Sequence, residues 1–270
     1  EMCIRDRLIS YHETLSDSEN NLFPILGEYN NIVAYQQTIY VRVEDTTIST
    51  DCFTYLELIL VVNDVPQIET NPTPLEVCDN DTDGFALFDL SLSNEEILNG
   101  LDPLEFEVSY YETLENAELE TNPITTPLAY TNVSPFTQDI YVRVENGTTE
   151  CYNTTALTLI VNELPVLIQP DPLELCDDNN TGDEVEEFTL EDSIGQVLNG
   201  QTGIDITFHL TQEDAESGDA PIFSPYTNIV NAQTIYIRAE NNITACVNTI
   251  TLDLRVNPLP SPVTVEPLEA

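Results

Sequence analysis

An acidic loop directly after Cys78 holds the residues of this 270-residue chain that are best suited to chemistry. Its carboxylates occupy alternate positions, in the sequence Asp-Asn-Asp-Thr-Asp-Gly from Asp79 to Gly84. Alternating carboxylates closed by a glycine resemble the start of a calcium loop, where oxygen ligands surround a hard cation and glycine permits a sharp turn. The predicted calcium ligands are Asp79, Asp81, Asp83, the carbonyl of Phe85 and Asp89, and, in a longer loop of the same kind, Asp177, Asn179 and Asp183. The simpler alternative is an acidic turn that only solvates one end of a domain.

The overall charge favours cations as partners. The chain has 49 acidic and 6 basic residues, which gives a formal net charge of -43. Phosphate recognition needs a basic surface, so nucleic acid is excluded as a partner. Crowded carboxylates repel one another, and a folded acidic domain is therefore stabilised by bound cations or by salt. The charge thus supports Ca²⁺ as the expected cofactor.

A repeated stretch positions these loops. It occurs three times, as QTIYVRVED from Gln37, QDIYVRVEN from Gln138 and QTIYIRAEN from Gln233, and a cysteine follows each copy. Apolar residues alternate along every copy, as in Ile140, Val142 and Val144. A period of two is that of a β-strand with one buried face. We therefore expect one such strand in the core of each repeat.

A single arginine recurs on the other face of this strand, at Arg42, Arg143 and Arg238. It could bind the carboxylate of a ligand. We favour a structural role, in which the guanidinium stacks on a tyrosine or pairs with a neighbouring glutamate across strands.

The repeat spacing is about 100 residues, the size of one small β-sandwich domain. We predict an all-β protein of tandem immunoglobulin-like β-sandwich domains in an elongated array. Proline-rich junctions without glycine favour stiff spacers over loose hinges. A short helical turn is expected at Ser93–Leu98, with Ser93 as its cap. The predicted domains are an incomplete repeat at 1–66, which lacks its leading strands, complete repeats at 67–165 and 166–260, and a linker or start of a further repeat at 261–270.

Six cysteines without a CxxC pair or nearby histidines argue against zinc and favour extracellular disulfides. Two patterns compete: pairing within a repeat, or pairing of sequence neighbours such as Cys52 with Cys78 and Cys151 with Cys176. A strand of about ten residues would hold Cys52 and Cys78 about 30 Å apart, too far for a disulfide. We therefore predict Cys78–Cys151 and Cys176–Cys246, each stabilising its repeat by about 4 kcal/mol. Cys52 is left with a partner upstream, or with Cys3.

Catalysis has little support in the sequence. His12 and His209 occupy equivalent positions, where the middle repeat has Tyr111, so we expect packing and no enzyme. No apolar run approaches the roughly eighteen residues of a membrane span, so we expect no membrane insertion. Residues 1–7 match nothing in the later copies, and we expect the chain to be a piece of a longer polypeptide.

The motifs CDNDTDGFALFDL, VSYYET, QDIYVRVEN and VNELP together resemble the tandem repeats of large secreted surface proteins of flavobacteria and other Bacteroidota. Such proteins typically end in a gliding-motility-associated or type IX secretion sorting domain. The resemblance implies export, a cell-surface location and roles in adhesion or motility.

The expected function is that of a non-catalytic rod in a surface adhesin, with neighbouring repeats, cell-surface glycans or other cells as partners. A second hypothesis is self-association into an extracellular filament. A third is a carbohydrate-binding module, which the absence of Trp disfavours.

Overall fold

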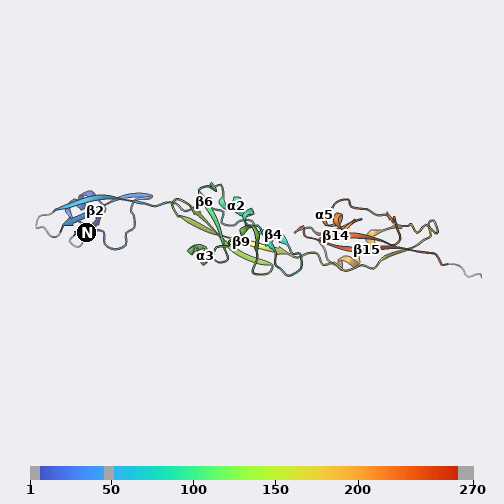
Figure 1. Ribbon diagram of the computed structural model, residues 1–270. Helices are drawn as coiled ribbons and strands as arrows, with labels where there is room; N and C mark the ends of the chain where they lie inside the picture. The colour runs from blue at the N-terminus through green and yellow to red at the C-terminus, as the bar shows by residue number, and fades with distance from the viewer. Residues whose placement is uncertain (1–6, 46–51, 261–270) are drawn as a thin grey trace, which may run out of the picture. The chain divides into compact units, whose positions relative to one another are not determined.

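A computed structural model of the protein describes residues 7–45 and 52–260 (Figure 1). The predicted linker at 261–270, Cys3 and residues 1–6 lie outside this part of the chain. We name the three copies repeat 1, repeat 2 and repeat 3, following the predicted ranges 1–66, 67–165 and 166–260.

The elements follow in chain order. Repeat 1 contains β1 (Arg7–His12), α1 (Leu15–Asn20), β2 (Gln36–Asp45) and β3 (Phe53–Val61). Repeat 2 contains β4 (Leu75–Cys78), β5 (Leu87–Phe88), η2 (Leu90–Ser93), α2 (Asn94–Leu98), β6 (Phe106–Tyr111), α3 (Leu114–Leu119), η3 (Pro127–Ala129), β7 (Tyr130–Thr131), β8 (Thr137–Asn146) and β9 (Tyr152–Asn162). Repeat 3 contains β10 (Leu173–Cys176), β11 (Glu187–Phe188), η4 (Leu190–Ser193), α4 (Ile194–Leu198), β12 (Ile204–His209), α5 (Gln212–Ser217), β13 (Tyr226–Thr227), β14 (Gln233–Asn241) and β15 (Val247–Asn257).

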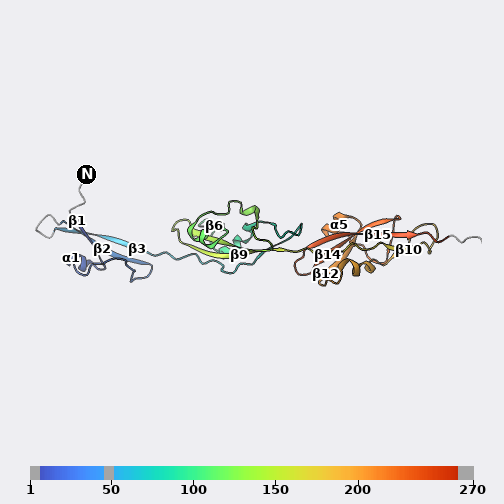
Figure 2. The same ribbon diagram turned by 90° about the horizontal axis from the view of Figure 1, so that it is seen from below.

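Repeats 2 and 3 have the same sheet topology. The larger sheet has the order β4-β9-β8-β6 in repeat 2 and β10-β15-β14-β12 in repeat 3, and a two-stranded sheet accompanies it. The short first strand runs parallel to the last one, whereas the other described pairings are antiparallel. Figure 2 shows this arrangement for β10, β12, β14 and β15. The predicted all-β class, with tandem immunoglobulin-like sandwiches, is confirmed.

The signature strands form the core as their alternation predicted. Ile140, Val142 and Val144 are fully buried, as are Ile235 and Ile237. In repeat 3, Ile235 and Ile237 pack against side chains from the opposite layer and from the neighbouring strands. These are Phe188, Leu190, Val197, Phe208, Leu252, Leu254 and Val256. Burial of such side chains contributes about 1.5–3 kcal/mol each.

Short helices are more frequent than the strand pattern indicated. The predicted turn at Ser93–Leu98 lies in η2 and α2, but the Ser93 hydroxyl donates back to the Leu90 carbonyl at 2.7 Å and does not cap α2. Helices α1, α3 and α5, which the sequence analysis did not predict, begin after Thr14, Thr113 and Thr211. Each threonine hydroxyl accepts an N–H of the first turn, at 3.1, 3.2 and 3.1 Å. This recurrent N-cap starts a helix that is too short to show helical periodicity.

The segment that precedes β6 or β12 covers one face of the larger sheet. We call residues 67–100 and 166–200 the leading segments of repeats 2 and 3. Their first residues already belong to the repeat that follows, because Glu69 N–H donates to Ile97 O and Ile168 N–H donates to Val197 O, both at 3.0 Å. The proline-rich junctions therefore end in contacts with the next repeat.

The chain divides into two compact units. One combines residues 1–68 with 101–107 and 144–153, and the other comprises 69–100, 108–143 and 154–270. Among the described residues, no helix is long and apolar enough to cross a membrane.

Candidate functional site

One disulfide joins repeat 2 to repeat 3. It links Cys78 to Cys246, whose Cα atoms lie 5.5 Å apart. Cys78 ends β4 and lies opposite Asn162, at the C-terminal end of β9. Cys246 immediately precedes β15 and is fully buried. The bond therefore connects the leading strand of one repeat to the hairpin loop of the next.

The predicted pairs Cys78–Cys151 and Cys176–Cys246 are wrong. The parallel register of β4 on β9 places Cys78 at the far end of the strand that Cys151 precedes. At about 3.3 Å per residue the two cysteines are about 35 Å apart, far beyond the roughly 7 Å limit of a disulfide. Cys176 lies opposite Asn257 for the same reason. Cys151 and Cys176 have no disulfide partner within the described part of the chain.

The contacts at this junction recur between repeats 1 and 2. Asn248 Nδ2 donates to Pro165 O at 2.9 Å, and Asn153 Nδ2 donates to Pro66 O at 3.1 Å. Each asparagine follows its hairpin cysteine by two residues, and each proline closes the preceding repeat. The two junctions therefore share a local geometry, although the described residues contain a disulfide only at the second.

The acidic loop of repeat 2 is built around Asp79. This side chain is fully buried, and its carboxylate accepts N–H groups from Asp81 at 3.1 Å, Thr82 at 2.8 Å and Gly84 at 2.8 Å. Asp81 and Asp83 are exposed. Carboxylate oxygens of the three aspartates lie within 4.8 Å of one another, which is the one such group of three acidic, histidine or cysteine side chains among the described residues.

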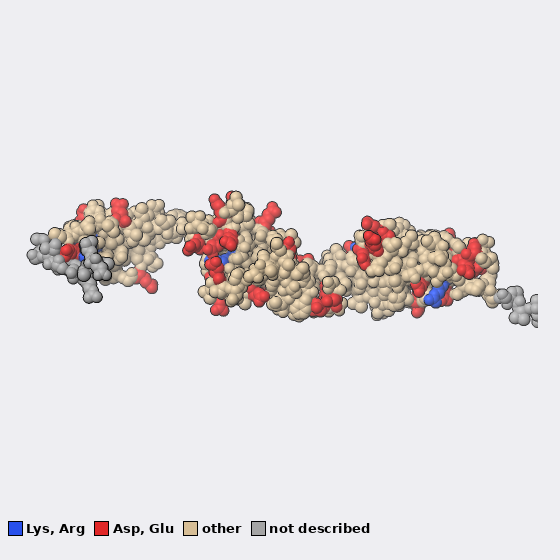
Figure 3. All heavy atoms as spheres, viewed as in Figure 1, with Lys and Arg blue, Asp and Glu red and all other residues tan. Residues whose placement is uncertain are grey.

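The surroundings shift the pKa values of Asp79 and Asp81 in opposite directions. Burial by itself would raise the pKa of Asp79, but the three backbone N–H donors outweigh it and hold that pKa below its usual value. Lost hydration, followed by the hydrogen bond and charge of Asp83, raises the pKa of Asp81. Negative charge is therefore concentrated where a cation would relieve it. Figure 3 shows many further acidic side chains and few basic ones on the visible face.

Two other predicted ligands have different contacts. The carboxylate of Asp89 accepts the N–H of Ser91 at 3.0 Å and its hydroxyl at 2.6 Å, and thereby caps η2. Phe85 N–H donates to Asp83 at 2.8 Å. Neither residue belongs to the aspartate group. Gly84 is required by packing, because φ is +80° and a Cβ there would meet Pro135 Cβ at 2.9 Å.

The corresponding loop of repeat 3 has a different arrangement. Asp177 accepts Gly182 N–H at 2.6 Å through Oδ2, and its buried Oδ1 has no hydrogen-bond partner. Asp183 accepts Val185 N–H at 3.0 Å. Asn179 N–H donates to Glu186 at 3.0 Å. Glu186 is buried and occupies the position of Ala86 in repeat 2. The sequence alone did not predict a role for Glu186, although this difference between the repeats was visible in it.

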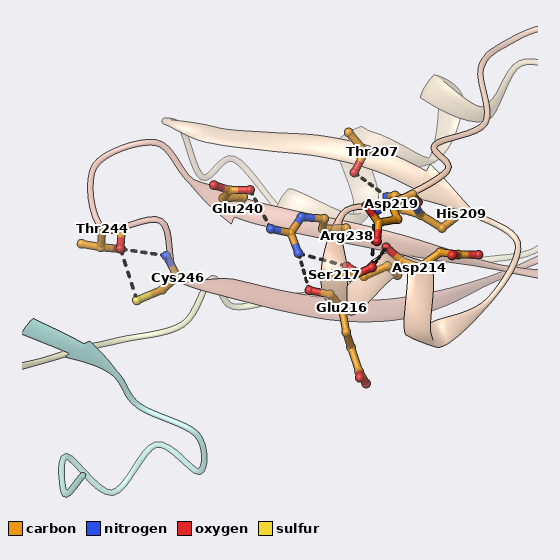
Figure 4. A network of polar contacts seen from close by, with 11 residues as sticks. Thr207, His209, Asp214, Glu216, Ser217, Asp219, Arg238, Glu240, Thr244 and Cys246 are labelled. Atoms are coloured by element: carbon orange, nitrogen blue, oxygen red, sulfur yellow. Dashed lines mark hydrogen bonds and ion pairs between the residues drawn. The ribbon is translucent and has the colours of Figure 1, made fainter. Parts of the chain in front are cut away.

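The recurrent arginine has a structural role at the end of a helix. The guanidinium of Arg143 donates to Ala117 O at 3.0 Å and Glu118 O at 3.4 Å in the last turn of α3. Arg42 and Arg238 make the same contacts with α1 and α5, and they also pair with Glu44 and Glu240 at 3.3 and 2.8 Å. Figure 4 shows this arrangement around Arg238. The aromatic partner in repeat 1 is Phe53 and not a tyrosine.

Other recurrent polar residues fix the loops. Gln138 Oε1 accepts Val133 N–H at 2.6 Å, and its Nε2 donates to the Tyr130 hydroxyl at 2.8 Å. Gln37 with Tyr29 and Gln233 with Tyr226 repeat this pair. The glutamine at the start of every signature strand was the sequence signal from which this glutamine–tyrosine pair could have been predicted.

The histidines are buried structural residues. His209 Nδ1 lies 2.7 Å from Asp219 O and its Nε2 lies 2.8 Å from the Thr207 hydroxyl (Figure 4). His12 has the same two kinds of partner in Leu22 O and Ser10. Because a carbonyl only accepts, Nδ1 carries the proton. Both ring nitrogens are thereby satisfied, as a packing role requires.

Solved structures show only distant similarity. Drosophila N-cadherin EC1-4 is 12% identical, with a TM-score of 0.22, over 95% of this chain and 69% of that one. The cadherin-like domains 1 to 4 of zebrafish RET are 8% identical with a TM-score of 0.19, over 93% and 66% of the two chains. The endo-fucoidan hydrolase MfFcnA4 is 14% identical with a TM-score of 0.19, over 85% and 35%. TM-scores this low support no conclusion about function. No curated protein matches the chain significantly.

A family model matches most of the chain. It describes a Flavobacterium inter-domain disulphide bond domain, and it matches residues 5–66, 74–165 and 172–260. The three matches coincide with the three copies of the signature strand, and the bond between Cys78 and Cys246 is of the kind that the description names. The resemblance to flavobacterial repeat proteins is confirmed at this level. The chain therefore belongs to the family of Flavobacterium inter-domain disulphide bond domains, of which it contains three tandem copies.

Proposed function

We propose that this chain is a non-catalytic, extracellular part of the stalk of a large surface adhesin, exported by the type IX route. Its repeats act as structural units, and a disulfide joins one repeat to its neighbour. Adhesion to cell-surface glycans or to other cells, and a part in gliding motility, belong to this proposal.

The disulfide between Cys78 and Cys246 is the observation that carries the proposal. A bond between consecutive repeats resists bending and separation under load more than a flexible linker does. Disulfides form and persist in oxidising surroundings, which favours a location outside the cytoplasm. The buried, fully hydrogen-bonded histidines support a structural and non-enzymatic role.

Surface labelling combined with thiol trapping tests the location. Cells that produce the protein are alkylated before lysis, and an antibody against the chain is applied to intact and to permeabilised cells. We expect labelling of intact cells, with Cys78 and Cys246 protected from alkylation until reductant is added. Labelling confined to permeabilised cells, with both thiols reactive, would contradict the proposal.

Calcium bound at the aspartate group of repeat 2 is a further part of the proposal. Asp81 and Asp83 are exposed beside Asp79, and their carboxylates lie close enough to share one ion. The carboxylate of Asp79 accepts three backbone N–H groups of the loop, so this residue fixes the conformation of the loop. Asp81 and Asp83 would therefore provide most of the protein's charge toward the ion.

Thermal unfolding with and without calcium tests this part. At about 100 times the Kd, calcium should stabilise the native state by about 2.7 kcal/mol, which raises the Tm of a repeat by several degrees. Sodium at matched ionic strength controls for screening. The double variant Asp81→Asn/Asp83→Asn should lose this increase, while Glu107→Gln/Glu163→Gln, which removes the same charge from exposed positions, should keep it. Equal shifts in both variants would show that calcium only screens charge.

A second candidate function is a subunit of an extracellular filament. The observation that favours it is the exposure of apolar side chains on β3 of repeat 1, where Leu56 and Leu58 are 57% and 40% exposed. Negative-stain microscopy of native material separates the two candidates. Uniform long fibres would support the filament, and isolated particles would exclude it.

A further inference from the structure

Repeat 3 contains a buried carboxylate oxygen that has no hydrogen-bond donor. This atom is Oδ1 of Asp177, a residue that is 2% exposed. The other oxygen of the same carboxylate, Oδ2, accepts Gly182 N–H at 2.6 Å, so the carboxylate faces into the loop that the two residues enclose. A buried charged oxygen without a donor is unfavourable, and this favours a bound ligand at the position.

Repeat 2 shows how the equivalent oxygen is satisfied within the protein. There Oδ1 of Asp79 accepts Asp81 N–H at 3.1 Å and Thr82 N–H at 2.8 Å. In both loops a glycine follows the first aspartate by five positions, and its N–H donates to Oδ2 of that aspartate. The first aspartate therefore has the same place in the two loops, and the difference is confined to the donors of its Oδ1.

Glu186 accepts the backbone donors that Asp177 lacks. Oε1 of Glu186 accepts Asp178 N–H at 2.9 Å and Asn179 N–H at 3.0 Å. The second of these N–H groups corresponds to that of Asp81, which donates to the first aspartate in repeat 2. Glu186 is itself only 7% exposed. Two buried carboxylates thus meet at one turn of the chain and compete for the same donors.

The backbone of Glu186 is held in place by Asn228. Asn228 Oδ1 accepts Glu186 N–H at 2.7 Å, and its Nδ2 donates to Glu184 O at 2.9 Å. In repeat 2, Asn132 Oδ1 accepts Ala86 N–H at the same distance of 2.7 Å. The backbone is therefore equivalent in the two repeats, and the glutamate side chain enters the loop where repeat 2 has only a methyl group.

No positive charge of the described residues balances these two carboxylates. The chain has no lysine, and the arginine ion pairs within the described ranges include neither Asp177 nor Glu186. Buried charges are normally paired with an opposite charge or coordinate a metal ion. Two carboxylates neutralise one divalent cation, and Ca²⁺ accepts such oxygens in a flexible geometry, whereas Mg²⁺ requires a near-ideal octahedron.

We propose that the loop 177–186 of repeat 3 binds one calcium ion, with Oδ1 of Asp177 and the carboxylate of Glu186 as its charged ligands. Water and loop carbonyls complete the coordination, because the three-carboxylate group of repeat 2 has no counterpart among the described residues of this loop. The ligands differ from those of the aspartate group in repeat 2. The inference therefore does not depend on the calcium site of the proposed function.

Calcium titration of the full chain carrying Asp81→Asn/Asp83→Asn separates this site from that of repeat 2. Isothermal titration calorimetry in about 0.15 M sodium chloride limits the contribution of charge screening. We expect one calcium ion to bind per chain. Adding Glu186→Gln should weaken binding at least about tenfold, equivalent to about 1.4 kcal/mol, because glutamine can still accept the two N–H groups but has no charge.

Glu187→Gln in the same background is the matched control. Glu187 is the next residue and is exposed, so its variant removes the same charge from the same part of the chain without altering the buried pair. It should change the Kd by less than about twofold. Equal weakening by the two variants would overturn the inference. Calcium binding that disappears with Asp81→Asn/Asp83→Asn alone would also overturn it, and would leave the site of repeat 2 standing.

Thermal unfolding of the same proteins provides a second measurement. In EDTA, Glu186→Gln should have a Tm equal to that of its parent or higher, because it removes one of two buried charges. With calcium the parent should have the higher Tm. A water molecule or a shared proton between Asp177 and Glu186, in place of calcium, would make the order of the two Tm values independent of calcium, and this result would contradict the inference.

Discussion

Tyr110 shows how a single buried hydroxyl fixes the leading segment of repeat 2. The side chain is 3% exposed, and its hydroxyl donates to Leu90 O at 2.9 Å and contacts Asn94 Oδ1. Burial, together with the charge of Asp89, raises the pKa of Tyr110 to about 12 despite a hydrogen bond with Ser93. Folding therefore favours the neutral phenol.

This raised pKa predicts a loss of stability in alkali. In the unfolded chain a tyrosine ionises near pH 10, whereas Tyr110 stays neutral in the native state until about pH 12. The contribution of Tyr110 to the free energy of unfolding is fully present below pH 10 and is lost as the pH rises from 10 to 12, by about 2.7 kcal/mol at most.

The measurement is the free energy of unfolding of wild type and Tyr110→Phe between pH 8 and about 11.5. Phenylalanine cannot ionise, so the stability difference between the two proteins should move in favour of the variant above pH 10. A constant difference would contradict the prediction.

Among the elements, the short helices α1, α3 and α5 depend on the arginine of the signature strand. Each helix has six residues and is too short to be stable alone. A threonine caps its start, and an arginine from the neighbouring strand donates to the carbonyls of its last turn, where a positive charge also complements the helix dipole. The helix and the strand therefore stabilise one another.

Arg143→Ala should destabilise repeat 2 by about 2–3 kcal/mol, because charged hydrogen bonds to buried carbonyls are lost. Arg255→Ala is the matched control, since it removes the same charge. Arg255 is 48% exposed, and its ion pairs with Glu174 and Asp253 are 3.8 and 3.7 Å long. Such exposed pairs contribute less than about 1 kcal/mol. Denaturant unfolding of both variants measures the contrast, and equal losses would show that only net charge matters.

At the scale of the whole molecule, the junction disulfide joins repeats 2 and 3 covalently, and we expect it to couple their unfolding. It closes a loop of 168 residues in sequence, which the chain-entropy model converts to about 5 kcal/mol. The side-chain contact between Asn248 and Pro165 supports the same junction without a covalent bond.

The double variant Cys78→Ser/Cys246→Ser should therefore unfold at lower denaturant concentration, with separate transitions for repeats 2 and 3. Cys176→Ser is the control, because Cys176 is exposed and has no disulfide partner among the described residues. Calorimetry checks both variants. An unchanged single transition in the double variant would show that noncovalent contacts alone couple these repeats.

Several features were determined by the sequence alone. Alternation in the signature strand placed Ile140, Val142 and Val144 in the core, because a strand has a period of two and one face must be buried. The recurrence of whole motifs indicated tandem domains. The alternate spacing of Asp79, Asp81 and Asp83 brought their carboxylates together, since neighbouring positions in a tight loop stay close. These are local properties, and local sequence specifies them.

The tertiary structure decided how the strands pair and which cysteines meet. Nothing in the sequence near Cys78 states that β4 runs parallel to β9, and this register separates Cys78 from Cys151 and brings it to Cys246. The role of Arg143 as a donor to the carbonyls of α3 likewise depends on residues that are distant in sequence. A strand pattern fixes the face that is buried but not the neighbour across the sheet, because backbone hydrogen bonds are the same for every partner.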